Sequence, residues 1–417
     1  MKYLRLVLLL SAATHGLAFA QDEEQRRAPP TEIPDFSNLD EYIYEPKSTV
    51  IIGVRHLSGA KASFSGQGSI GSAEDPGLAT GANLTRTYHD GRVNPDTRVA
   101  ARLDTSGNPI IDPQTGSQVF DPIAADGRTN SWSFSDNAQV TPDGYVAFHT
   151  FSADVIDTGS RARASNSTNG LDLSVSRDMG RLFGTRLSWN ITAGMSVNDI
   201  SANTVDQVLA TLRTLTDFYS LYGVTPPDAP YTAPSSSTTT VLDASGNAVV
   251  NADGSTQTIT VDTTVLLGNE PAGRDTSSAT NDTNVANRWQ LKGAYYTFRA
   301  GPTLWVPISS RFRASVSLGA AVIYSGTNYT VTQTLQPDFG AEISDTHTSS
   351  AYKLLPGYYA DATLQYDLTE RAGFYAGAVF QSAGSYTQSI TNETANYATK
   401  IDLGNQSGLR AGMTIRF

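Results

Sequence analysis

The sequence holds few side chains whose types and spacing could do chemistry, and histidine is the scarcest. Beyond residue 20 there are four histidines: His56, His89, His149 and His347. His347 follows Asp345 by two residues, which pairs an imidazole with a carboxylate as general base catalysis requires. His149 lies near Ser152 and Asp154, but alternation along a strand puts it on the opposite face from both. The chain has no cysteine, no G-x-S-x-G elbow and no H-E-x-x-H motif, and we expect no metal or cofactor site.

Charged residues recur at alternate positions of several apolar segments, opposite the apolar side chains. A period of two is typical of strands, whose successive side chains point to opposite faces. Charges on an enclosed face are costly to bury singly, so arginines and carboxylates must pair there. The predicted interior network consists of Arg186, Arg299, Arg311, Arg313, Arg410, Arg416, Asp172, Asp361 and Asp367. The alternative is a narrow hydrated channel whose basic rim, Arg311, Arg313 and Arg416, favours anions.

Eight alternating segments position these residues. In the last segment, one face consists of Leu409, Ala411, Met413, Ile415 and Phe417, and the other of Arg410, Gly412, Thr414 and Arg416. The predicted strands are 49–57, 166–177, 185–200, 289–306, 311–334, 351–368, 372–390 and 399–417. A count of ten adds 129–140 and 145–157, but the first of these lacks a sustained apolar face. Eight strands are therefore favoured, and the extra pair is expected to form a hairpin above the membrane.

The composition agrees with strands that cross a membrane. Charged residues make up 17% of the chain, below the ~25% of soluble domains. Mean hydropathy is nevertheless -0.26, and after residue 20 no apolar run approaches the ~20 residues of a membrane helix. The apolar faces end in aromatics, as a lipid-facing band does. We predict an all-β fold, a closed antiparallel transmembrane β-barrel, with an aromatic girdle of Phe312, Tyr324, Tyr366, Phe374, Tyr386 and Phe417.

The first residues indicate export. Residues 1–20 combine Lys2 and Arg5 with an apolar run and end in Ala18-Phe19-Ala20, which predicts a secretory signal peptide. Without them, 27 basic and 40 acidic residues remain, a net charge of -13. Such a surface repels polyanions, so nucleic acid is not expected as a partner. The polar, proline-rich residues 21–47 are predicted to form a flexible periplasmic segment before the barrel, 48–417.

Two very long connections, 58–165 and 201–288, alternate with short ones, and we expect them to be outside loops. They share a weak repeat, because residues 103–116 and 242–254 both place Ser-Gly-Asn before an apolar pair. This spacing is typical of β-hairpin tips. Calcium binding by the Asp and Asn oxygens is the alternative to simple turn formation. Residues 235–240, all serine or threonine, form a low-complexity stretch that we expect to be mobile.

The signal peptide, the alternating strands and the terminal Phe417 together resemble the small outer-membrane β-barrel families of bacteria, of the OmpA- and OmpW-like class. The resemblance implies that Phe417 is part of the signal read by the barrel assembly machinery. It also implies contact with outer-membrane lipid and lipopolysaccharide, and both termini in the periplasm. Asp345-Thr-His347 is similar to half of the active site of the omptin surface proteases, although a convincing second acidic pair is not found.

The favoured function is a structural or surface-interaction role through the long acidic loops, without enzymatic activity. A narrow porin-like channel for small solutes is the first alternative, and a surface hydrolase of the barrel type is the second. The sequence does not indicate which extracellular ligand is bound.

Overall fold

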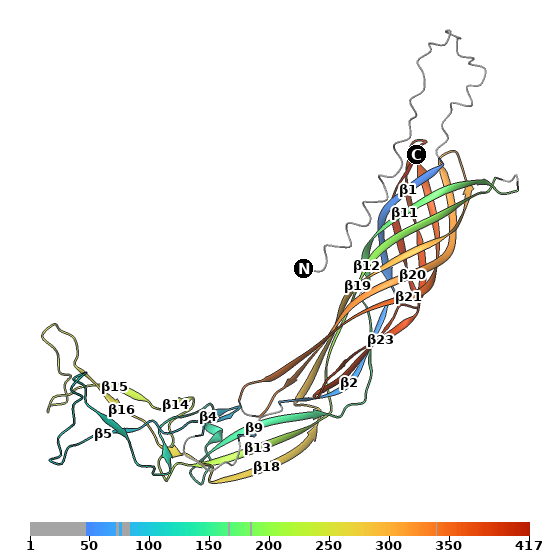
Figure 1. The fold of residues 1–417 in the computed structure, drawn as a ribbon. Helices are drawn as coiled ribbons and strands as arrows, with labels where there is room; N and C mark the ends of the chain where they lie inside the picture. The colour runs from blue at the N-terminus through green and yellow to red at the C-terminus, as the bar shows by residue number, and fades with distance from the viewer. Residues whose placement is uncertain (1–46, 72–74, 77–83, 166, 184–185, 339) are drawn as a thin grey trace, which may run out of the picture. The chain divides into compact units, whose positions relative to one another are not determined.

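The computed structural model describes residues 47–71, 75–76, 84–165, 167–183, 186–338 and 340–417 (Figure 1). Regular structure in these residues is strand, apart from one short 3-10 helix, Asn137–Gln139. The predicted all-β, antiparallel fold is confirmed. Among the described residues, no helix is long and apolar enough to cross a membrane. The predicted signal peptide and nearly all of the 21–47 segment lie outside the described residues.

A ring of eight antiparallel strands forms the main body, and Figure 1 labels most of its members. In order around the ring they are β1 (Ser48–Ser58), β11 (Thr168–Arg181), β12 (Ser188–Gln207), β19 (Val285–Pro307), β20 (Phe312–Leu335), β21 (Ile343–Asp367), β22 (Ala372–Ala383) and β25 (Gln406–Arg416). Pairing of β1 with both β11 and β25 closes the ring. Phe417 and Ser48 also exchange two backbone hydrogen bonds, 3.1 and 2.9 Å long, so both ends of the ring sequence lie at one rim.

The register defines how far the strands are staggered. A path through directly paired residues starts at Ala314, visits all eight strands and returns to β20 at Tyr324, ten residues further on. At ~3.3 Å per residue and ~4.8 Å between strands, this stagger tilts the strands by about 41° from the barrel axis. The tilt falls within the roughly 35–45° of transmembrane barrels.

Two predicted strands are each broken in two. Segment 372–390 divides at Gly384 into β22 and β23 (Ser385–Thr391), and segment 399–417 divides at 403–405 into β24 (Ala395–Asp402) and β25. The breaks let β23 and β24 leave the ring and pair in a second sheet with β2 (Lys61–Ile70).

The second sheet also contains strands from the long connections. Its order is β18 (Gly273–Asn281), β13 (Ala210–Ser220), β9 (Tyr145–Val155), β2, β24 and β23, with β10 (Arg161–Ala164) paired to β2. The predicted hairpin of 129–140 with 145–157 is wrong, because β9 pairs along its whole length with β13. Only Val140 and Val146 form an isolated bridge between the two segments. Hydrogen bonding to a distant strand has replaced the local pairing.

The remaining strands are short. One small sheet contains β3 (Arg86–Tyr88), β4 (Gly91–Val93), β8 (Trp132–Phe134) and β14 (Tyr231–Thr232). Three pairs complete the fold: β5 (Val99–Ala101) with β6 (Phe120–Pro122), β7 (Arg128–Thr129) with β17 (Leu267–Gly268), and β15 (Ser236–Thr240) with β16 (Thr258–Asp262). We call everything outside the ring, that is β2 to β10, β13 to β18, β23 and β24, the head.

Two apolar cores show that the head is folded. The larger core includes Phe64, Trp289, Tyr329 and Tyr397 and lies between the ends of the long ring strands and the second sheet. The smaller core consists of head residues alone, among them Trp132 and Phe148. The long connections are therefore mostly structured rather than loose loops.

Candidate functional site

The ring encloses a network of charged side chains centred on Asp172. Arg299 donates from Nη2 to both oxygens of Asp172, at 2.8 and 2.9 Å. Arg410 Nε lies 3.5 Å from Asp172 Oδ2, and its Nη1 donates to Asp361 Oδ2 at 3.0 Å. All four residues are buried. The structure thus brings together four predicted interior residues, from β11, β19, β21 and β25.

Aromatic rings complete the filling of this layer. The Arg410 guanidinium lies 4.9 Å from the centre of the Tyr375 ring, and the Arg299 guanidinium lies 5.6 Å from that of Tyr359. The cavity beside them has a volume of about 20 Å³, which is room for about one water molecule. Its lining includes Thr192, Trp305, Ser317, Asp361, Gln365 and Arg410. At this level the lumen is packed with side chains.

A second cluster lies at the rim that carries the chain end. Asp367 pairs with Arg313 at 3.1 Å and with Arg416 at 2.6 Å. Gln365 donates to the same carboxylate at 2.8 Å, and Arg313 lies over the Trp305 ring at 4.7 Å. The rim arginines are neutralised in part by a carboxylate that the sequence also predicted.

Two predicted members of the network lie elsewhere. Arg186 precedes the first residue of β12, Ser188, and its side chain is exposed. Arg311 precedes the first residue of β20, is exposed, and donates to the Tyr366 hydroxyl at 3.4 Å. The sequence placed both in strands, but the turns extend further than expected, so neither side chain points inward.

Arg55 is an interior residue that the sequence analysis missed. It is 2% exposed, while the neighbours that alternate with it on β1, Ile52 and Val54, are more than half exposed. Its Nη2 donates to Gln381 Oε1 at 2.6 Å and its Nη1 to the Ser196 hydroxyl. Both partners are neutral, so Arg55 is a buried cation without the direct carboxylate contact that Arg299 and Arg410 have. The alternation Ile52, Val54, His56 was the signal that could have placed it.

We expect Gln381→Glu to stabilise the barrel, because the new carboxylate would face Arg55 at hydrogen-bond distance. Hydrogen bonds to charged groups contribute about 1.5–3 kcal/mol. The free energy of unfolding, measured by urea titration of the protein in detergent micelles or vesicles, should rise by an amount of this order.

Gln365→Glu is the matched control for this variant. Gln365 is also buried on the interior face, but it donates to Asp367, so its replacement sets two carboxylates against each other and should lower the unfolding free energy. A decrease for both variants would contradict the view that Arg55 lacks a counter-charge.

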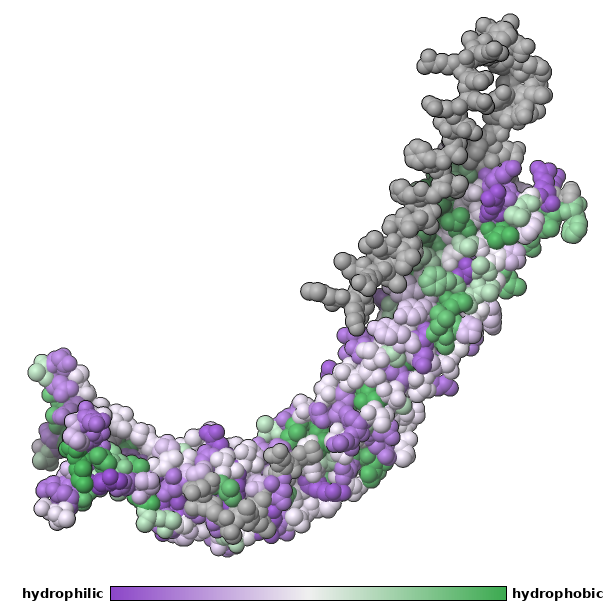
Figure 2. Space-filling model, in the orientation of Figure 1, coloured by the Kyte–Doolittle hydropathy of each residue, from purple (hydrophilic) through white to green (hydrophobic). Residues whose placement is uncertain are grey.

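The polarity of the strands reverses along their length. On β20 the outward side chains are apolar from Phe312 to Tyr324 and polar beyond it, at Asn328 and Thr330. The inward side chains change in the opposite sense. They are Ser315 and Ser317 in the first part, whereas from Ile323 onward four of seven are apolar: Ile323, Tyr329, Val331 and Leu335, interspersed with Ser325, Thr327 and Gln333. On the face drawn in Figure 2, apolar residues gather over the ring near the chain end, and polar residues predominate over the continuation of its strands.

The same reversal occurs on neighbouring strands. On β19 the exposed residues change from Phe298 and Tyr296 to Lys292 and Arg288. The inward ones change from Arg299 and Thr297 to Tyr295, Leu291 and Trp289. A segment with an apolar outer face and a polar interior thus joins a segment with a polar outer face and an apolar core.

Aromatic side chains mark both ends of the apolar outer band. At one end, the rings of Phe312 and Tyr366 are 5.0 Å apart. At the other end, Tyr324 lies 6.5 Å from Tyr296 and 6.2 Å from Tyr352. Among the remaining predicted girdle residues, Phe374 and Phe417 are about half exposed on the same side as Phe312.

Tyr386 does not belong to this girdle. It is buried, and its hydroxyl lies 2.9 Å from both the Ser325 and the Thr327 hydroxyls. The prediction assumed one strand from Phe374 to Tyr386. The break at Gly384 instead carries Tyr386 into the core of the head.

The histidines differ in their surroundings. His347 Nε2 lies 3.4 Å from Asp345 Oδ2. The His347 side chain is nevertheless on the inner face of β21, is 8% exposed and contacts Asn392. His149 Nδ1 lies 2.5 Å from Asp90 Oδ2 in the head. As alternation predicts, it faces away from Ser152 and Asp154.

Burial also shifts proton affinities in the head. It lowers the pKa of His89, which accepts a hydrogen bond from the Phe151 amide at 2.8 Å. It also raises the pKa of Tyr219 to about 12. Of the two, Tyr219 belongs to the smaller apolar core, whereas His89 is only partly buried.

The repeated loop sequences form matching turns. Asp104 Oδ1 accepts hydrogen bonds from the amides of Ser106 and Asn108, and Asp243 Oδ1 accepts them from Ser245 and Asn247. Turn formation therefore accounts for these carboxylates. Within the described residues, no group of three or more His, Asp or Glu side chains is placed to hold a metal ion. Residues 236–240, expected to be mobile, form strand β15.

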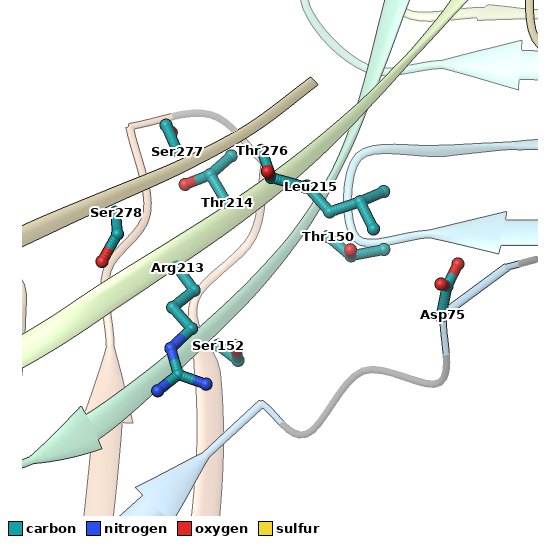
Figure 3. Close-up of a pocket in the computed structure, with 9 residues that line it drawn as sticks. All are labelled: Asp75, Thr150, Ser152, Arg213, Thr214, Leu215, Thr276, Ser277 and Ser278. Carbon is teal, nitrogen blue, oxygen red and sulfur yellow. The ribbon is translucent and has the colours of Figure 1, made fainter. Parts of the chain in front are cut away.

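The head carries an open pocket of about 370 Å³ on the face of β9, β13 and β18, shown in Figure 3. Its lining consists of Asp75, Thr150, Ser152, Arg213, Thr214, Leu215, Thr276, Ser277 and Ser278. Arg213 pairs with Asp154 at 2.9 Å, and its side chain is 66% exposed. This hydroxyl-rich pocket offers many hydrogen-bonding groups and one accessible cation to a polar ligand.

Comparison with known proteins gives little. No family model matches the chain, and no curated protein matches it significantly. Among solved structures, the outer-membrane protease OmpT from Escherichia coli covers 89% of this chain and 97% of its own, with 12% identity and a TM-score of 0.28. The alignment with a FadL homologue from Pseudomonas aeruginosa covers 89% of this chain and 90% of the homologue, with 9% identity and a TM-score of 0.17. At identities and TM-scores this low, neither similarity supports an assignment of family or function.

Proposed function

We propose that this chain is an integral outer-membrane β-barrel protein whose eight-stranded ring spans the bilayer and whose head lies outside it. The observation that carries the proposal is the reversal of polarity along the ring strands. An apolar outer face around a polar interior is stable in lipid, and the opposite arrangement is stable in water. Closure of the ring also pairs the strand edges that lipid could not satisfy.

The dimensions support a membrane span. Phe312 and Tyr324 are 12 residues apart on β20, which at the derived tilt corresponds to roughly 30 Å along the axis. The apolar band of such barrels is ~25 Å tall. Strands β20 and β21 have 24 and 25 residues, whereas ~9–11 suffice to cross a bilayer. The excess length extends beyond the apolar band and packs against the head.

The lengths of the connections support an orientation of the ring in the membrane. The links 308–311 and 368–371 lie at the rim that holds Ser48 and Phe417, while the long connections leave from the other rim. Short periplasmic turns and long outer loops are the pattern of bacterial barrels. We therefore propose that the rim with Ser48 and Phe417 faces the periplasm. Phe417, exposed on the terminal strand, is in place to present an assembly signal, and the apolar band is in place to contact lipid and lipopolysaccharide.

The packed lumen favours a structural barrel over a solute channel. We expect the pure protein in planar bilayers to show no discrete conductance steps, because the Asp172 network and its aromatic neighbours leave a cavity of only about 20 Å³. Insertion is verified in parallel by protease protection of the ring strands. Regular conductance steps from inserted protein would favour the narrow channel instead.

We propose that the head acts in surface interaction. Digestion of intact cells tests its exposure: cleavage is expected first within 241–257, because strands β15 and β16 are exposed along their whole length. The ring and β13, which is paired on both sides, should resist. Cleavage at 241–257 only after cell lysis would contradict the proposed topology.

The proposal includes no enzymatic role. Asp345 and His347 are the nearest approach to a catalytic pair, but His347 is almost entirely buried and hydrogen-bonds to Asn392. The hydroxyl-rich pocket suits binding of a polar surface ligand, such as polysaccharide, by hydrogen bonds.

A further inference from the structure

The outer surface of the ring is not uniformly convex, because an apolar groove of about 790 Å³ crosses five of its strands, from β21 to β11. Its lining consists of Val54, Arg55, His56, Asn169, Leu364, Ala376, Gly377, Leu409, Arg410 and Ala411. The small residues Ala376, Gly377 and Ala411 form the floor, since their neighbours Leu364 and Leu409 are much larger. On a barrel in a bilayer, such a groove faces lipid rather than water.

The groove follows a row of directly paired residues, which rises along the barrel axis from strand to strand. Ala376, Ala411 and Val54 lie on the row that leads from Ala314 up to Tyr324, and Val54 stands at its halfway point. His56 lies two residues further along β1 towards the head. By the same geometry it is roughly 8 Å below the level of Tyr324. The groove thus begins near the middle of the apolar band and ends near its outer edge, within one leaflet.

Its outer end is polar. His56 Nδ1 lies 2.8 Å from Asn169 Oδ1, and both side chains are exposed on the outward face. The outward residues that precede them towards the band centre, Val54 and Leu171, are apolar and more than half exposed. A polar pair at this depth leaves its remaining hydrogen-bonding groups, the Asn169 amide nitrogen and the second ring nitrogen of His56, to partners from the lipid.

We propose that this groove binds one acyl chain of a phosphorylated lipid in the leaflet next to the head, with the headgroup held by His56 and Asn169. The proposal rests on the membrane insertion proposed above. An apolar hollow with one polar end matches an acyl chain and its headgroup. A second copy of the chain fits less well, because a two-fold interface would set groove against groove and leave both unfilled.

The test is photo-cross-linking of the full chain in phosphatidylcholine nanodiscs that contain phosphatidylglycerol with a diazirine in its acyl chain. We expect cross-links, mapped by mass spectrometry, to concentrate on peptides that contain Val54, Leu409 and Ala411. The double variant Ala376→Phe, Ala411→Phe fills the groove and should reduce labelling there to the level of the remaining barrel surface. Ala300→Phe, which adds the same ring to an exposed site on β19, should leave it unchanged.

His56→Ala tests the headgroup contact separately. In this variant the groove should still be labelled, but the preference for phosphatidylglycerol over a diacylglycerol probe with the same chain should be lost. Uniform labelling around the ring, or cross-links between protein copies at the groove, would overturn the proposal. Resistance to alkaline extraction shows whether the chain is inserted at all. Failure there refutes the membrane assignment, whereas uniform labelling of inserted protein refutes only the lipid site.

Discussion

Asp172→Asn is expected to destabilise the barrel by about 3–5 kcal/mol, because it leaves the buried Arg299 guanidinium without a carboxylate and leaves Arg410 with Asp361 alone. Asp172 receives both hydrogen bonds of Arg299 Nη2 and lies 3.5 Å from Arg410 Nε. Its side chain is 0% exposed, so water cannot replace the lost charge. The measurement is the free energy of unfolding in urea, followed by the heat-dependent shift of the folded barrel in electrophoresis.

Two further variants separate loss of charge from loss of shape. Asp367→Asn removes a carboxylate of the same size at the rim, where its arginine partners are partly exposed, and should cost much less. Adding Arg299→Met to Asp172→Asn removes the cation that has lost its carboxylate and should recover part of the stability. If the rim and interior variants cost the same, the interior network would not be what holds the lumen closed.

The ring could be predicted from the sequence because alternation is local. Strand β20 alternates from Phe312 onward, and each of the eight predicted segments overlaps a ring strand. The reversal of polarity also has a local sign: Ala320–Tyr324 is apolar at five successive positions, where the outer face is still apolar and the inner face has become so. Alternation alone does not distinguish the part of the strand with an apolar outer face from the part with an apolar inner face, so it predicts one continuous strand of the barrel.

The head could not be predicted in the same way, since its pairings join distant segments. Lys61 pairs with Asp402, and Val155 pairs with Ala210. No local pattern specifies such partners; they are selected by the core that they enclose. Gly384 was the one local sign that the ring strand ends there, and it was read as an ordinary strand residue. The misplacement of Tyr386 follows from it.

The interior network was predicted in part for a related reason. Arg299 and Arg410 lie in long alternating strands, where the face of each residue is unambiguous. Arg186 lies two residues before such a strand, and the predicted strand began three residues too early, which was enough to misplace it. Arg55 has unambiguous apolar neighbours, but no nearby acidic residue drew attention to it. Its partners, Ser196 and Gln381, are uncharged and far away in sequence.

Leu318→Arg should cost about 2–4 kcal/mol if the ring spans a bilayer, because the side chain is 60% exposed near the middle of the apolar band. Asn328→Arg is the control on the same strand and the same outward face, ten residues closer to the head. In the proposed topology Asn328 faces water, and the new charge should change the unfolding free energy by less than about 0.5 kcal/mol.

The difference between these two variants is specific to lipid. Both add the same side chain to an exposed strand position, so a water-soluble barrel would tolerate them almost equally. Unfolding of each variant from lipid vesicles in urea measures the difference. A large penalty at Leu318 with none at Asn328 places the membrane boundary between them, where the Tyr324 ring meets Tyr296 and Tyr352. Equal penalties would mean that the exposed apolar band faces something other than a bilayer.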